Sequence, residues 1–160
     1  MSILYNISIQ IHIIAIHIAA LFNAKAKLWV KGRKAIFQKL AEATKDNQDI
    51  VWFHCASLGE FEQGKPIIEG YKIKHPTHKI LLTFFSPSGY EIRKNYDEVD
   101  WVFYLPADTN KNAKKFINII NPIKVIFIKY EFWFNYMAEC KKQNIPFYSV
   151  SSIFRKEQSF

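Results

Sequence analysis

Two glutamates stand where a carboxylate could take part in a reaction, and Glu60 is the first of them. It ends the string CASLGE at residues 55–60, which leads from an apolar run through a glycine into an amphipathic stretch. A helix that begins there favours a negative charge in its first turn, and an ionised carboxylate can accept a proton from a substrate hydroxyl. The alternative is that Glu60 is only one of the acids that are common at helix starts.

Glu131 is the second candidate acid. It lies in the string KYEFW, directly after another apolar run, and it alternates with Lys129. Side chains two residues apart on an extended backbone point to the same side. Glu131 could therefore form an ion pair with Lys129, or it could stabilise positive charge at a reacting centre. The spacing leaves both interpretations open.

Small polar residues in the same kind of segment are candidates for binding an acceptor substrate. Ser86, Ser88 and Gly89 precede a predicted helix, whose free amides could hold a phosphate or a sugar hydroxyl. Ser88 could equally cap that helix. In CASLGE, Gly59 would permit a tight or left-handed turn. The full set of acceptor-binding candidates is Ser57, Gly59, Ser86, Ser88, Gly89 and Lys129.

The elements that must position these residues alternate along the chain. Short runs rich in β-branched and aromatic residues predict strands that are covered on both faces, at residues 50–54, 80–85, 101–105, 125–129 and 147–151. Amphipathic stretches predict helices at 61–74, 88–96, 109–120 and 132–143. Asp108 or Thr109 would cap the third helix. The alternation predicts an α/β fold, a Rossmann-like parallel sheet with helices on both faces, with ligands bound beyond the carboxyl ends of the strands.

Several sequence motifs are absent, and their absence narrows the chemistry. The chain has no P-loop, no GxGxxG, no HExxH, no GxSxG and no DxD. Its two cysteines, Cys55 and Cys140, have neither CxxC nor zinc-finger spacing. His12 and His17 are five residues apart and so do not share a helix face. We therefore expect no metal site and no cofactor.

The net charge of +8 is concentrated near the amino terminus. Residues 3–22 are apolar and uncharged, and residues 23–45 carry seven basic side chains against one acidic. An uncharged run of about 20 residues followed by positive charge indicates a membrane surface rather than a nucleic acid. The run could span the bilayer, lie in its interface, or dock on a partner domain. We therefore divide the chain into a membrane-associated helix and basic juxtamembrane helix (1–46) and a sheet domain (47–160).

Read together, five strings resemble the amino-terminal half of the 3-deoxy-D-manno-oct-2-ulosonic acid (Kdo) transferases. They are WFHCASLGEFEQGKPIIE, LLTFFSPSGYE, YLPADTNKNAKKF, FIKYEFWFN and IPFYSVSSIFR. The resemblance covers essentially the whole chain, including the apolar start and the GRK of residues 32–34. Several separate motifs in the same order make it specific.

The resemblance implies one half of a GT-B glycosyltransferase, in which two Rossmann-like domains face each other across a cleft. The first domain binds the lipid acceptor, and the second, which lies outside this chain, binds CMP-Kdo. Such enzymes transfer Kdo to the lipid A precursor lipid IVA at the cytoplasmic face of the inner membrane, with inversion and without a metal. By resemblance Glu60 is the general base and Glu131 a transition-state stabiliser. Lys31, Arg33 and Lys34 are candidates, by position alone, for meeting acceptor phosphates.

The chain departs from the family pattern in two respects. Phe134 stands where members usually have proline, which should affect only the start of the following helix. The chain also ends near the end of the first domain, so we expect it to be inactive by itself. The alternatives are a lipid-directed GT-B enzyme with another donor, and a non-enzymatic, membrane-anchored module that binds an acidic lipid. A pure binder of an anionic lipid would gain nothing from Glu60.

Overall fold

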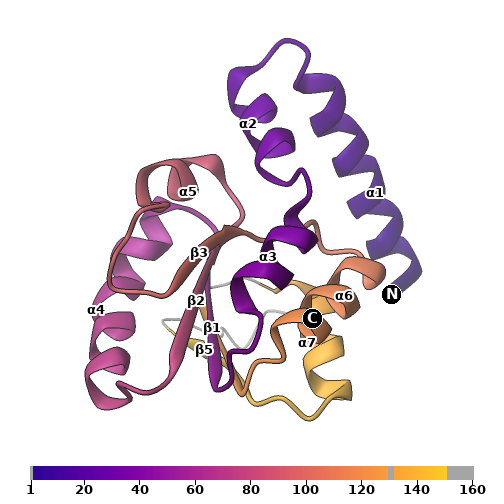
Figure 1. The fold of residues 1–160 in the computed structure, drawn as a ribbon. Coiled ribbons are helices and arrows are strands. Elements are labelled where there is room, and N and C mark those ends of the chain that lie inside the picture. Colours follow the sequence, from indigo (N-terminus) through magenta and orange to yellow (C-terminus); the bar gives the residue numbers. More distant parts are fainter. Residues whose placement is uncertain (1, 130–131, 151–160) are drawn as a thin grey trace, which may run out of the picture.

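A computed structural model describes residues 2–129 and 132–150, and these residues contain a five-stranded parallel sheet (Figure 1). The strands are β1 (Ile50–Cys55), β2 (Lys79–Phe84), β3 (Trp101–Tyr104), β4 (Lys124–Ile128) and β5 (Phe147–Val150). Their order across the sheet is β3-β2-β1-β4-β5, and every pair is parallel. The predicted α/β fold is confirmed, and each described strand end lies within one residue of its predicted position.

Helices cover both faces of this sheet (Figure 1). The helices after the strands are α4 (Leu58–Lys74), α5 (Pro87–Arg93), α6 (Asn110–Ile120) and α7 (Phe134–Lys142). Adjacent residues of β1 point to opposite faces, so Trp52 packs with α6 and α7 whereas Phe53 packs on the α4 side. Both side chains are fully buried. The strands are therefore apolar throughout because both of their faces are covered.

The amino-terminal segment forms three helices: α1 (Ser2–Ala19), α2 (Ala24–Gly32) and α3 (Ile36–Thr44). α1 ends earlier than the apolar run because the chain turns at residues 20–23, where Asn23 caps α2 by accepting hydrogen bonds from the amides of Lys25 and Ala26. No single described helix is long and apolar enough to cross a bilayer, and α1 and α2 pass that test only as a pair bent by 119°. The expected membrane-associated helix is therefore not confirmed.

α1 packs against the sheet domain through its polar side chains. The Tyr5 hydroxyl donates to the Asp108 carboxylate over 2.5 Å, and the Asn6 side chain accepts a hydrogen bond of 3.0 Å from Asn135. Further along the helix, His12 stacks on Phe85 with the ring centroids 6.5 Å apart. Asn6 and His12, two of the polar residues within residues 3–22, thus contact the sheet domain. α3, in turn, buries Ile36 and Leu40 in the same core as α6 and α7.

Candidate functional site

Glu60 lies in the first turn of α4, in the connection that follows β1. The helix begins three residues earlier than predicted, and Ser57 is its N-cap residue. The Ser57 hydroxyl donates to the Glu60 carboxylate instead of bonding a backbone amide. Glu60 is half-buried. Its carboxylate is therefore oriented by a neighbouring hydroxyl and still partly open to a ligand.

Gly59 lies in the first turn of α4. It does not adopt the left-handed conformation, one of the two that we predicted for it, because none of the glycines has a positive φ. Gly59 is exposed, and a Cβ added to it would meet only the Ser57 hydroxyl, at 3.8 Å. The missing side chain instead leaves space open beside Ser57 and Glu60.

The two serines after β2 lie at the start of α5. We predicted that Ser88 could cap this helix, but Ser86 does so instead. Ser86, not Ser88, is the N-cap residue, and its hydroxyl accepts a hydrogen bond from the Ser88 amide. The two hydroxyl oxygens are 2.9 Å apart. Gly89 is buried, and a Cβ there would lie 2.3 Å from the ring of Phe84. Close packing therefore explains the glycine without a ligand.

The segment after β4 holds the second candidate acid. Glu131 lies outside the described residues, and so does its expected pairing with Lys129. Lys129 itself has a left-handed backbone, with φ of 65°. Its amide donates to the carbonyl of Val150, and its own carbonyl accepts from the Ser149 hydroxyl. A non-glycine residue at positive φ stores backbone strain, and such residues cluster at functional sites.

The connections after β1, β2 and β4 lie together at one edge of the sheet. The Ser86 amide donates to the carbonyl of Ala56 over 2.7 Å, which joins the first two connections. Trp133, which precedes α7, donates its indole N–H to the imidazole of His54 over 3.1 Å and packs on the Phe85 ring at 4.6 Å. The prediction that these three connections lie close together is therefore correct. The reason is that the carboxyl ends of parallel strands all lie at the same edge of the sheet.

His54 is a residue that sequence reasoning passed over. It is fully buried on β1, next to Cys55, and burial lowers its pKa to about 3, so the imidazole is neutral at physiological pH. Its second ring nitrogen lies 2.9 Å from the hydroxyl of Thr83 and 3.1 Å from the Thr83 carbonyl. The only signal in the sequence was a histidine inside an otherwise apolar strand.

Arg33 is partly buried, and its guanidinium is engaged by backbone carbonyls. Its guanidinium donates to the carbonyls of Trp29, Phe85 and Leu105 at 2.8–3.1 Å and lies 3.8 Å from the centre of the Trp29 ring. Burial lowers its pKa, and within the described part of the chain no carboxylate pairs with it. Arg33 therefore ties α2 to the ends of β2 and β3. Lys31 and Lys34, in contrast, are exposed.

Asp108 caps a different helix from the one that we considered. The Thr109 hydroxyl accepts the Asn112 amide and caps α6. The Asp108 carboxylate accepts the amides of Asn135 and Tyr136, each at 3.1 Å, and so caps α7. Burial raises the pKa of Asp108 above its ordinary value, while these hydrogen bonds oppose the shift.

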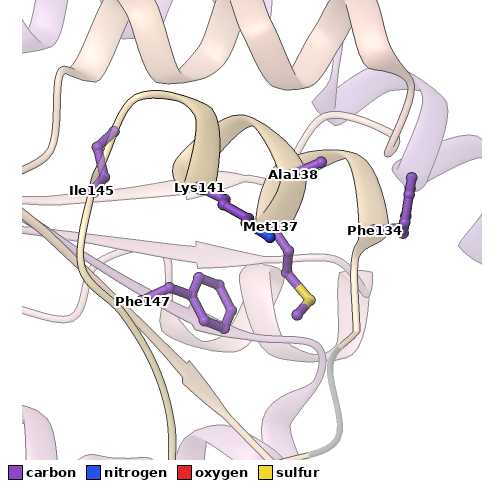
Figure 2. Close-up of a pocket in the computed structure, with 6 residues that line it drawn as sticks. All are labelled: Phe134, Met137, Ala138, Lys141, Ile145 and Phe147. Atoms are coloured by element: carbon purple, nitrogen blue, oxygen red, sulfur yellow. The ribbon is translucent and has the colours of Figure 1, made fainter. Parts of the chain in front are cut away.

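A hollow of about 610 Å³ lies between α7 and β5 (Figure 2). Its lining is apolar except for one lysine: Phe134, Met137, Ala138, Lys141, Ile145 and Phe147. None of the candidate site residues lines it. The hollow offers no acid or nucleophile. We therefore identify the candidate site from the polar residues at the strand ends and not from the size of the hollow.

The fold defines a class: parallel α/β domains, in which ligands generally bind beyond the carboxyl ends of the strands. The chain belongs to the 3-deoxy-D-manno-octulosonic-acid transferase (kdotransferase) family, whose family model matches residues 31–160. The 3-deoxy-D-manno-octulosonic acid transferase of Aquifex aeolicus is 36% identical over 101 residues, which are 62% of this chain and 27% of that protein. The transferase of Haemophilus influenzae is 30% identical over 98 residues, 61% of this chain and 23% of that protein.

A plant protein also matches. The probable mitochondrial 3-deoxy-D-manno-octulosonic acid transferase of Arabidopsis thaliana is 29% identical over 98 residues, which are 61% of this chain and 22% of that protein. The resemblance seen in the motifs is therefore confirmed. The matched part spans only about a quarter of each of these relatives.

Proposed function

We propose that this chain is the acceptor-binding half of a glycosyltransferase that moves Kdo from CMP-Kdo to lipid IVA in lipopolysaccharide biosynthesis. Membership of the family supports Kdo as the sugar that is transferred. The observation that carries the proposal is the Glu60 carboxylate, oriented by Ser57 and only half-buried at the end of β1. A strand-end carboxylate in this setting suits proton abstraction from an acceptor hydroxyl.

In the proposed reaction, the acceptor hydroxyl attacks the anomeric carbon of Kdo while Glu60 takes the hydroxyl proton. The new C–O bond forms as the bond to the CMP phosphate breaks, and CMP leaves with the electron pair. A single displacement of this kind inverts the anomeric centre. The transition state is oxocarbenium-like, and Glu131 stabilises its positive charge electrostatically. A monophosphate leaving group has no pyrophosphate for a metal to neutralise.

The donor site belongs to a second domain of a GT-B arrangement in this proposal. CMP-Kdo would bind there and face the strand-end edge across a cleft. The acceptor would contact the two turns that hold Ser57 and Ser86, which are joined by the Ser86–Ala56 hydrogen bond. The described domain by itself would then bind acceptor without turning it over.

The proposed location is the cytoplasmic face of the inner membrane, with α1 in the membrane interface. Large apolar side chains of α1 and the turn after it are exposed, from 50% for Ile7 to 88% for Phe22. They are Ile3, Leu4, Ile7, Ile11, Ile14, Ile18, Leu21 and Phe22. Exposed lysines follow on α2, where they suit anionic headgroups. The contacts of Tyr5 and Asn6 to the body support a helix that lies in the interface.

The test compares wild type with Glu60→Gln in the complete gene product that carries this chain. Transfer from CMP-Kdo to lipid IVA is measured beside binding to vesicles that contain lipid IVA. Loss of the base should lower kcat by about 10²–10⁴-fold while binding is unchanged. Glu62→Gln is the matched control, because Glu62 is exposed and pairs with Arg93.

Each other outcome would redirect the proposal. Full activity in Glu60→Gln would remove this glutamate from the mechanism. A folded wild type that binds lipid IVA but transfers no Kdo would point to another donor sugar or to a binding module. Tighter binding by Glu60→Gln, without any transfer by the wild type, would favour the binding module.

A further inference from the structure

The buried imidazole of His54 has no role in the proposed reaction. Its Nε2 accepts the indole N–H of Trp133 over 3.1 Å. An indole nitrogen can only donate, so Nε2 carries no proton and the neutral ring carries its proton on Nδ1. That proton faces Thr83, whose hydroxyl and carbonyl oxygens lie 2.9 Å and 3.1 Å from Nδ1. The tautomer is thus set by its two neighbours.

The Thr83 side of this network is fixed by the sheet. The Trp52 indole donates to the Thr83 hydroxyl over 2.7 Å, and that hydroxyl lies 3.4 Å from the carbonyl of Phe53, to which it donates. Trp52, His54 and Thr83 are all fully buried. Trp52, Thr83 and His54 thus each donate to an acceptor on β1 or β2. The imidazole therefore cannot rotate without breaking one of these hydrogen bonds.

The Trp133 side is the start of α7. Trp133 is the N-cap residue of α7, and its ring packs against Phe85 at 4.6 Å. The Phe85 carbonyl is held in turn by Arg33. Lys129, at the other end of the same connection, is fixed by Val150 and Ser149. Both described flanks of the segment that contains Glu131 are thus anchored to the sheet.

A histidine in this place is unexpected on packing grounds alone. An apolar side chain of similar size would fill the space between β1 and α7 and would need no polar partner, whereas a buried imidazole must have both nitrogens satisfied. What only the imidazole adds is a directional acceptor for the indole of Trp133. His54 also lies six residues before Glu60, and Trp133 lies two residues after Glu131.

We infer that His54 is a positioning residue: it holds Trp133 at the carboxyl edge of the sheet and so sets the start of α7 relative to the turn that carries Glu60. The inference rests on the proposed function for its kinetic consequence, because displacement of Trp133 would disturb the carboxyl edge of the sheet at which Glu60 acts. His54 acts through Trp133 and does not touch the substrate.

The first test is spectroscopic and needs no substrate. The four tryptophan indole N–H signals of the ¹⁵N-labelled chain are assigned by Trp→Phe variants. The Trp133 indole should exchange with solvent at least about tenfold faster in His54→Phe than in wild type, and His54→Gln should restore the slow rate because its amide can both donate and accept. Unchanged exchange in His54→Phe would overturn the inference.

The second test is kinetic and uses the complete gene product. His54→Phe and Trp133→Phe should each lower kcat for Kdo transfer about tenfold with little change in KM, and the double variant should be no worse than either single. Trp101→Phe, on β3, is the control. Additive losses, or a folded Trp133→Phe with full kcat, would overturn the inference. If the wild type transfers no Kdo, the proposed function fails and the indole exchange alone decides whether His54 holds Trp133.

Discussion

The hydroxyl of Tyr5 donates a hydrogen bond of 2.5 Å to the carboxylate of Asp108, 103 residues further along the chain. The same carboxylate accepts the amides of Asn135 and Tyr136 at the start of α7. One buried acid therefore joins the amino-terminal helix to the helix that follows Trp133. The placement of α1 and the start of α7 depend on each other through Asp108.

Replacing Tyr5 with phenylalanine should loosen α1 without unfolding the sheet. The change removes a hydrogen bond to a carboxylate, which contributes about 1.5–3 kcal/mol. Hydrogen–deuterium exchange of the α1 amides should become at least about tenfold faster, while β1 and β4 stay protected. Tyr148→Phe, on the exposed face of β5, is the control and should change neither region. Equal exchange in Tyr5→Phe and wild type would show that other contacts hold α1.

Replacing Asp108 with alanine should destabilise the whole domain. The variant leaves two amides of α7 without their cap, which costs about 0.5–2 kcal/mol, and it also removes the acceptor of the Tyr5 hydroxyl. The free energy of unfolding, measured by urea denaturation, should fall by about 2–4 kcal/mol. The exposed Asp97 provides the control variant Asp97→Ala. A decrease as small as that of the control would mean that water replaces the carboxylate at the α7 amides.

Two glycine substitutions should have opposite effects on stability. Gly89→Ala places a methyl group 2.3 Å from the Phe84 ring, and overpacking of this kind costs about 1–3 kcal/mol. Gly59→Ala meets nothing closer than 3.8 Å and should be neutral or stabilising by up to about 1 kcal/mol in a helix. Thermal unfolding of both variants checks the pair. If Gly59→Ala keeps its stability but loses transfer, the open space beside Glu60 is needed by the acceptor.

His54 should make the stability of the domain fall in mild acid. Its pKa is about 3 in the folded protein because burial disfavours the charged ring, against about 6.5 in the unfolded chain. Below pH 6.5 the unfolded chain takes up a proton that the folded protein does not. The free energy of unfolding then drops by up to about 1.4 kcal/mol per pH unit until about pH 3, and above pH 6.5 this residue contributes no pH dependence.

The comparison with His54→Gln isolates this contribution. Between pH 6.5 and pH 5 the wild type should lose about 2 kcal/mol more than the variant in urea denaturation experiments. Other titrating groups affect both proteins equally, so the difference reports His54. Parallel pH profiles for the two proteins would contradict the assignment of His54 as a buried neutral imidazole.

The strands were predictable because their residues carry the signal locally. The runs that became β1 and β4 are apolar on both faces, and that pattern needs no knowledge of the partners to be recognised. The position of Glu60 followed from the same logic, since the residue after a strand and at the start of a helix is set by chain order. Gly59 and Ser88 were harder, because open space and the choice between two capping serines depend on packing and backbone geometry.

The sequence by itself thus determined the parallel α/β fold, the family, and the edge of the sheet where Ser57, Glu60 and Ser86 meet. Only the tertiary structure decided that Asp108 caps α7 and not α6, that Arg33 bonds to three backbone carbonyls, and that Trp133 bonds to His54. The physical reason is the separation of these partners along the chain. A hydrogen bond between residues 79 positions apart, such as that from Trp133 to His54, has no local pattern, because its partners are chosen by how the strands and helices pack.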